Sequence, residues 1–157
     1  MTNTLTPELF RVCDANLNRL KEGIRVVEDI ARYKENNKEL SLQLKELRHL
    51  AKIDDMKLLL DGRDSVNDVL RKSTASEMKR ETLQSIITAN FKRAQESSRV
   101  LEEIYKLVDA ELSENFKHIR YSLYALDRGA IIKCFVSKNN YVQTKIFSLC
   151  SQKHRGR

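Results

Sequence analysis

The strongest constraint on the fold is a segment that occurs near the start of the chain and again beyond its midpoint. Residues 15–31 and residues 89–105 align without a gap, and eight of the seventeen aligned positions are identical. The identical pairs are Ala15/Ala89, Asn16/Asn90, Arg19/Arg93, Glu22/Glu96, Arg25/Arg99, Val26/Val100, Glu28/Glu102 and Ile30/Ile104. A chain that carries the same segment twice is expected to build the same structural unit twice.

Each copy is followed by a second related segment. Leu47-Arg48-His49 follows the first copy, and Ile119-Arg120-Tyr121 follows the second at almost the same distance. The predicted unit is therefore a long helix, a short turn and a second helix, with copies over about 8–53 and 79–128. Two such units can bury their apolar faces against each other. We expect an all-α bundle with pseudo-two-fold symmetry over residues 1–129, followed by a basic extension over residues 130–157.

Spacing and chain breakers support long helices. The sequence holds only four glycines and one proline. Apolar residues recur at the helical period in both copies: Leu9, Leu17, Leu20, Ile24, Val27 and Ile30, then Leu83, Ile87, Ala94, Leu101, Ile104 and Val108. Thr6-Pro7-Glu8 predicts a capped helix start. Turns are predicted around residues 36–37 and 109–114, and residues 73–77 are expected to link the copies. Residues 61–65 predict a turn that leads into a short helix.

The net charge of +7 is concentrated at the end of the chain. Residues 130–157 contain six lysines and arginines and no acid, which leaves about +1 on residues 1–129. A body with so little positive charge does not favour nucleic-acid binding. For the extension itself, a continued helix, a hairpin and a segment that folds on a partner all stay open.

Localisation and redox state follow from what the sequence lacks. No stretch approaches the ~18 consecutive apolar residues of a membrane span, and the first residues form no signal peptide, so we expect a cytoplasmic protein. The three cysteines, Cys13, Cys134 and Cys150, are odd in number and widely spaced. They match no metal or disulfide pattern and are expected to be reduced thiols.

The repeated polar residues are the first candidates for a functional site. Asn16 and Asn90 fall inside the apolar stripe, where a buried amide without a partner costs about 1–3 kcal/mol. Each therefore needs either a ligand or a hydrogen bond between helices.

Charged residues repeat at intervals of three in both copies: Arg19, Glu22, Arg25 and Glu28, then Arg93, Glu96, Arg99 and Glu102. A ladder of salt bridges within each helix explains opposite charges at this spacing. Arginine in both copies favours a second reading, in which its planar fork grips carboxylates or phosphates.

An aspartate-rich segment surrounds Gly62. Asp61, Asp64 and Asp68 lie close together in sequence, with Arg63 between them. The segment predicts either a turn that caps a helix or a carboxylate pair that holds Mg²⁺ beside a phosphate-binding arginine. Neither a phosphate-binding glycine-rich loop nor a metalloprotease motif is present, so no standard motif identifies the function.

Several segments together resemble a known family: residues 14–32, Leu47-Arg48-His49, Arg63-Asp64 with Asp68, residues 89–93, residues 99–103 and residues 120–124. They are similar to the helical domain usually fused in front of thiamine-phosphate synthase, which is regarded as a hydroxymethylpyrimidine-phosphate kinase. The resemblance covers roughly residues 9–128. No synthase barrel follows in this sequence, so we expect that this chain does not make thiamine phosphate by itself.

The resemblance implies phosphoryl transfer from ATP, with Mg²⁺, to 4-amino-5-hydroxymethyl-2-methylpyrimidine phosphate. By position, it implies phosphate or transition-state contacts from five arginines: Arg19, Arg25, Arg63, Arg93 and Arg99. It implies Asp64 and Asp68 as Mg²⁺ ligands, with Glu22 and Glu96 as alternatives. Residues implied at the pyrimidine phosphate are Asn16, Asn90, Glu22, Glu96, His49 and Arg120.

The rival hypothesis is a non-catalytic helical module. Such a module would dimerise and dock a separate thiamine-phosphate synthase, with the charged ladders as its interface. A homodimer is the expectation for a small helical enzyme as well, because two-fold dimers are the commonest oligomers.

Overall fold

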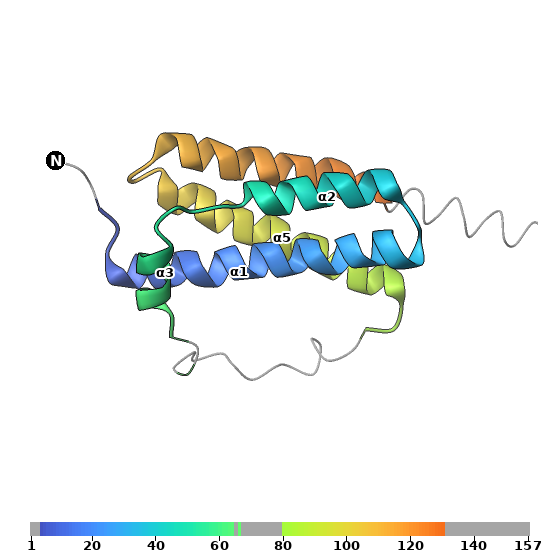
Figure 1. The fold of residues 1–157 in the computed structure, drawn as a ribbon, viewed down its shortest axis with the longest axis horizontal. Helices are drawn as coiled ribbons and strands as arrows, with labels where there is room; N and C mark the ends of the chain where they lie inside the picture. Colours follow the sequence, from blue (N-terminus) through green and yellow to red (C-terminus); the bar gives the residue numbers. More distant parts are fainter. Residues whose placement is uncertain (1–3, 65, 67–79, 131–157) are drawn as a thin grey trace, which may run out of the picture.

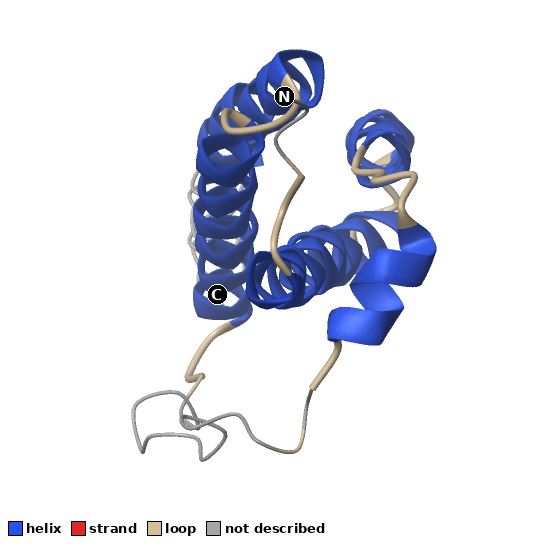
Figure 2. Ribbon diagram, turned by 90° about the vertical axis from the view of Figure 1, so that its left-hand side faces the viewer, coloured by secondary structure: helices blue, strands red, loops and turns tan. Residues whose placement is uncertain are grey.

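The computed structural model describes residues 4–64, 66 and 80–130. All regular secondary structure in this part of the chain is helical (Figure 2). The helices are α1 (Pro7–Asp29), η1 (Ile30–Lys34), α2 (Lys38–Leu50), α3 (Met56–Gly62), α5 (Leu83–Tyr105) and a helix over residues 110–130 (Figure 1). The expected all-α fold is confirmed.

The two long helices begin at side-chain caps. The Thr6 hydroxyl accepts a hydrogen bond from the Leu9 amide, and Pro7 occupies the first turn, as the sequence predicts. At the start of α5, Thr82 and Ser85 form a reciprocal capping box. Both helices therefore start at fixed residues, which sets the register of their apolar faces.

The first connection lies where the sequence predicts it. The backbone continues from α1 through the π-helical turn η1 and reverses at Asn36, whose φ of 49° is in the left-handed region. Asn37 then caps α2, because its side-chain oxygen accepts a hydrogen bond from the Leu40 amide at 3.1 Å.

One predicted turn needs correction. The second connection lies at residues 106–109 rather than 109–114, because Asp109 accepts a hydrogen bond from the Leu112 amide at 2.9 Å and starts the next helix. The turn predicted at residues 61–65 begins within the last residues of α3, which ends at Gly62, and the short helix predicted after it falls on residues 67–79, outside the described residues. The expected linker at residues 73–77 and the extension after residue 130 lie outside the described residues.

Helix α1 is the centre of the packing. It contacts α5, α2 and α3, and α3 lies beside the first turns of α1 (Figure 1). The two helices approach closely at Gly23, where an added Cβ atom would be 2.8 Å from the backbone oxygen of Asn90 and 3.3 Å from the Ala94 Cβ. Glycine is therefore what allows the two repeat copies to meet at this crossing.

Apolar side chains from both copies form one core. Its fully buried large members come from α1, α2, α3, α5 and the helix over residues 110–130: Leu20, Ile24, Leu44, Leu59, Phe91, Leu101, Phe116, Ile119 and Leu123. Among the described helices, none combines the length and apolar content that crossing a bilayer requires.

Candidate functional site

A buried glutamate holds the two helices of each copy together. In the first copy, Glu28 accepts hydrogen bonds from Arg25, three residues earlier on α1, and from Arg48 on α2, whose Nε is 2.8 Å away. In the second copy, Glu102 accepts from Arg99 at 2.7 Å and from Arg120 at 2.9 Å. Both glutamates are 2 % exposed. The repeat therefore places the same ion-pair cluster twice.

These clusters give part of the charged ladder a structural role. Arg25 also binds Asp29 at 3.1 Å, and Arg99 binds Glu103 at 2.7 Å. The predicted phosphate contacts of Arg25 and Arg99 would have to be shared with these carboxylates. Their guanidinium groups remain about half exposed, so their outer N–H groups can still reach a ligand.

Arg120 is the most enclosed arginine of the second cluster. Its guanidinium contacts the Tyr121 and Tyr124 rings, with centroids 4.9 and 5.7 Å away. The hydrogen bonds that Arg120 donates to Tyr124 and Glu102 raise its pKa, so it stays charged. Its predicted contact with the pyrimidine phosphate stays a prediction, and the structure adds a role in holding Glu102.

Each of the two repeated asparagines makes one side-chain hydrogen bond within its own helix. The Asn16 side chain donates to the Val12 carbonyl at 2.9 Å, and the Asn90 side chain donates to the Ile86 carbonyl at 2.8 Å. The hydrogen bond is thus made along the helix and not between helices. Among the described residues, neither amide oxygen accepts a hydrogen bond.

A groove between α1 and α5 brings together several of the predicted site residues. Its volume is about 580 Å³, and its lining residues are Asn16, Arg19, Ala89, Lys92, Arg93, Glu96, Ser97 and Val100. We call it the α1–α5 groove. Arg19 and Arg93 occupy equivalent positions of the two copies, so the pseudo-symmetry places both arginines at one groove.

Positive charge predominates in the α1–α5 groove. Arg19 and Arg93 are exposed, and neither has a carboxylate partner within the described part of the chain. Lys92 lies 3.7 Å from Asp127, which also accepts a hydrogen bond from Gln95. Glu96 is the acid of the lining. Two free arginine forks beside an amide oxygen suit a ligand that carries phosphate and a polar ring.

Other predicted residues lie outside this groove. Glu22 is exposed on α1, His49 is exposed on α2, and Asn90 is half-buried on α5. None of them lines the α1–α5 groove. Their predicted contacts with substrate stay predictions.

Arg63 and Asp64 are both engaged with α1. Arg63 binds Asp14 through two hydrogen bonds of 2.8 and 2.7 Å. Asp14 is buried, and this contact raises the pKa of Arg63. Asp64 pairs with Arg11 at 3.7 Å and accepts a hydrogen bond from the Val66 amide. Asp68, the other predicted Mg²⁺ ligand, lies outside the described residues.

The predicted Mg²⁺ site stays a prediction. Within residues 4–64, 66 and 80–130, no three His, Cys, Asp or Glu side chains gather as a metal site. Mg²⁺ in phosphoryl-transfer sites is commonly held by one or two carboxylates together with substrate phosphates. Glu96 supplies one such carboxylate at the α1–α5 groove.

A buried thiol lies apart from the groove. Cys13 is fully buried, and burial raises the pKa of its thiol to about 11, an effect that the neighbouring Tyr105 hydroxyl partly offsets. Burial also raises the pKa of Tyr105. Both groups are therefore neutral at physiological pH and belong to the core.

Sequence reasoning missed two groups of these side chains. Arg48 completes the Glu28 cluster, and its signal was available in the repeated Leu47-Arg48-His49 and Ile119-Arg120-Tyr121 segments. Asp14 and Lys92 carried no signal of their own, because their partners are far away in sequence.

Comparison with known proteins supplies an independent observation. A model of the ThiD2 family matches residues 11–129. A thiamine-phosphate synthase of Thermosynechococcus vestitus is 40% identical over 122 residues, which are 77% of this chain and 35% of that relative. Those of Synechocystis sp. and Rhodopirellula baltica are 39% and 37% identical, covering 78% and 85% of this chain but 36% and 37% of the relatives. The chain thus spans about a third of the length of these curated relatives. No solved structure matches.

Proposed function

This chain belongs to the ThiD2 family, and from that premise we propose that it acts in thiamine biosynthesis as an ATP-dependent kinase. Its proposed acceptor is hydroxymethylpyrimidine phosphate, and its product is the diphosphate. The resemblance of the repeated segments to this kinase family supports the reaction. The name thiamine-phosphate synthase, carried by the relatives, supports the pathway.

The observation that carries the proposal is the α1–α5 groove. Among the described residues, it combines two arginines that have no carboxylate partner, Arg19 and Arg93, with the side-chain amide of Asn16, whose oxygen accepts no hydrogen bond there. The arginines suit two phosphate-bearing reactants, and the amide oxygen suits the amino group of a pyrimidine. A groove of about 580 Å³ also falls within the usual range of ligand sites.

The chemistry asks little of the protein beyond positioning and positive charge. A phosphate oxygen of the acceptor attacks the γ-phosphorus of ATP, the bond to the β–γ bridging oxygen breaks, and ADP leaves. That oxygen is largely deprotonated at pH 7 because the second phosphate pKa is ~6, so a general base is not essential. Arg19 and Arg93 would hold the two anions together and stabilise the charge spread over the transferring group.

Mg²⁺ would neutralise phosphate charge when bound with ATP, and Glu96 is the residue that would hold it at the groove. Lys92 contributes a further cation whose charge is shared with Asp127. Asn16 would orient the pyrimidine ring through its amide oxygen.

The test is an assay of the purified chain with ATP, Mg²⁺ and the pyrimidine monophosphate, with the diphosphate detected by mass. Replacing Arg93 by glutamine should lower kcat by about 10²–10³-fold, the usual effect of removing one donor to a developing anion. Lys117→Gln is the matched control, because Lys117 is a surface cation paired with Glu114 and lies outside the groove. Unchanged turnover in Arg93→Gln would refute the assignment of the groove.

A second candidate function follows from the coverage of the relatives. The chain matches about a third of each thiamine-phosphate synthase, so its relatives carry a further part. We therefore retain the proposal that the chain dimerises and docks a separate synthase without catalysis. Under that proposal, neither ATP nor the pyrimidine phosphate raises the melting temperature, whereas binding of either ligand to the native state would raise it.

A further inference from the structure

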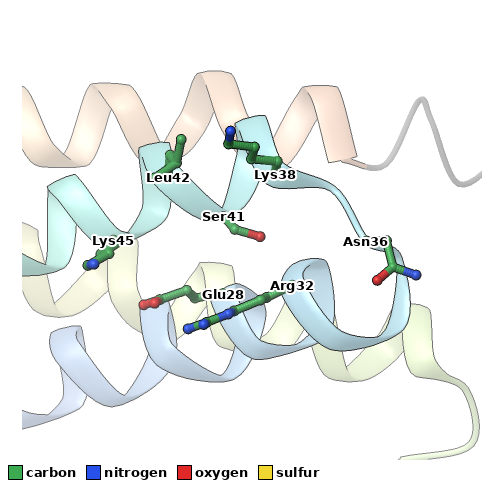
Figure 3. Close-up of a pocket in the computed structure, with 7 residues that line it drawn as sticks. All are labelled: Glu28, Arg32, Asn36, Lys38, Ser41, Leu42 and Lys45. Atoms are coloured by element: carbon green, nitrogen blue, oxygen red, sulfur yellow. The ribbon is translucent and has the colours of Figure 1, made fainter.

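A second cavity lies at the C-terminal end of α1. It is bounded by the end of α1, the turn η1 and the start of α2, and its volume is about 320 Å³. Its lining residues are Glu28, Arg32, Asn36, Lys38, Ser41, Leu42 and Lys45. Figure 3 shows Glu28 and Arg32 on one wall, Asn36 at the turn and the α2 side chains on the other wall. We call it the η1–α2 pocket.

Among the described residues, cations outnumber acids in the lining of the η1–α2 pocket. Its cations are Arg32, Lys38 and Lys45, and its acid is Glu28. Glu28 is already bound by two arginines that do not line the pocket. Over the described residues, the three pocket cations have no carboxylate partner. An anion would therefore meet uncompensated cations there.

The second repeat copy provides an internal comparison. Aligned on the repeated segments, Arg32 corresponds to Lys106, and Lys45 corresponds to Lys117. In the second copy both cations are paired: Lys106 lies 2.7 Å from Glu103, and Lys117 lies 3.1 Å from Glu114. Leu42 occupies the position of Glu114 in the first copy. Acids thus neutralise these two cations in the second copy, whereas the equivalent cations of the first copy, Arg32 and Lys45, have no acidic partner among the described residues.

The backbone also differs between the copies at this place. The segment from Glu28 to Arg48 is two residues longer than the segment from Glu102 to Arg120. The longer connection contains the π-helical turn η1 and the left-handed Asn36. Short π-helical insertions occur frequently at functional sites. The first copy therefore has both the charge and the altered backbone of a binding site.

The η1–α2 pocket is separate from the α1–α5 groove. Arg19 and Glu28 are nine residues apart on α1, which corresponds to about 13 Å along the helix axis. A phosphate in the pocket is therefore too far from Arg19 to be the one transferred at the groove. The small volume suits a compact ligand.

We propose that the η1–α2 pocket is a second ligand site, which binds the phosphate or diphosphate group of a small phosphorylated molecule. Arg32 supplies a planar fork for the phosphate oxygens, and Lys38 and Lys45 supply point charges on the facing wall. The proposal concerns binding alone and does not depend on the kinase reaction.

The test is calorimetric titration of the full chain with pyrophosphate at constant ionic strength. Saturable binding should weaken at least tenfold in the double variant Arg32→Gln/Lys45→Gln. The matched control is Lys106→Gln/Lys117→Gln, which removes the same number of charges at the equivalent positions and should leave binding unchanged. Arg32 and Lys45 are exposed, so the variant should keep its helicity, which circular dichroism checks.

Other outcomes of the titration are equally informative. Equal weakening in both double variants would show only a general charge effect and would overturn the proposal, as would undiminished binding in Arg32→Gln/Lys45→Gln. Loss of all pyrophosphate binding in Arg93→Gln would show that the anion binds in the α1–α5 groove, and it would also overturn the proposal. If the site is confirmed, displacement of pyrophosphate by the pyrimidine phosphate would show that the pocket binds a ligand of the kinase reaction. Lack of displacement would show that it binds another phosphorylated molecule.

Discussion

Replacing Gly23 by alanine should destabilise the protein, although alanine is the better helix former. In an open helix the change would stabilise by about 1 kcal/mol. At Gly23, however, the new methyl group would lie 2.8 Å from the backbone oxygen of Asn90, which cannot move aside as a flexible side chain would. Overpacking of this kind typically costs about 1–3 kcal/mol. We expect a net loss of about 1 kcal/mol, measured by urea unfolding followed by circular dichroism.

The same helical bundle contains the control for this prediction. Gly129 lies in the helix over residues 110–130, and an added Cβ atom there would have no neighbour within 4 Å. Gly129→Ala should therefore stabilise the protein by about 0.5–1 kcal/mol through helix propensity alone. Equal stabilisation by both substitutions would refute the close crossing of α1 and α5.

Three further predictions concern buried charges and the thiol. Glu102→Gln should lower the free energy of unfolding by about 3 kcal/mol, measured in urea, because it breaks a buried ion-pair cluster. Arg63→Ala should lower the melting temperature further than Asp14→Asn does, because the first leaves a buried carboxylate unpaired and the second leaves an exposed arginine; the reverse order would contradict the burial argument. Folding raises the pKa of Cys13 from 9.0 to about 11. The protonated thiol therefore contributes stability that is complete below pH 9 and is lost as the pH rises through 11, on the order of 3 kcal/mol in all. The free energy of unfolding, measured in urea at pH 8 and at pH 10.5, should fall less between these two pH values in Cys13→Ala than in the parent chain.

The prediction for Arg63 also affects how activity data are interpreted. Loss of turnover in Arg63→Ala would be ambiguous, since that arginine joins the end of α3 to α1 through Asp14. Arg93 is the better probe of catalysis, because it is exposed and has no carboxylate partner among the described residues.

Most of the fold could be predicted because periodicity and repetition are properties of the sequence itself. The helical spacing, the Thr6 cap and the first turn at residues 36–37 follow from local rules. The second turn could not be placed as well, because its position depends on which polar side chain caps the next helix, and Asp109 does so. Aspartate fits both a turn and a helix cap.

The candidate site could be predicted only in part. The repeat singled out Asn16, Arg19 and Arg93, and the structure brings them to one groove. The repeat gave no means to distinguish Arg19 and Arg93 from Arg25 and Arg99, which are bound to buried glutamates. Each of these four arginines has a glutamate three residues later. Glu28 and Glu102 are also bound by Arg48 and Arg120 of the following helices, and that difference depends on tertiary packing.

The duplicated glutamate clusters have a consequence for how the molecule could be divided. Each cluster joins two helices of the same copy, and the Asp14–Arg63 pair also lies within the first half. The contact between α1 and α5 across Gly23 is a close packing of helices rather than a shared ion pair. Each half therefore keeps these charged partners when the chain is cut between residues 66 and 80. We expect two separately expressed fragments, residues 1–66 and 80–157, to reassemble without a covalent link, as two subunits of a heterodimer would.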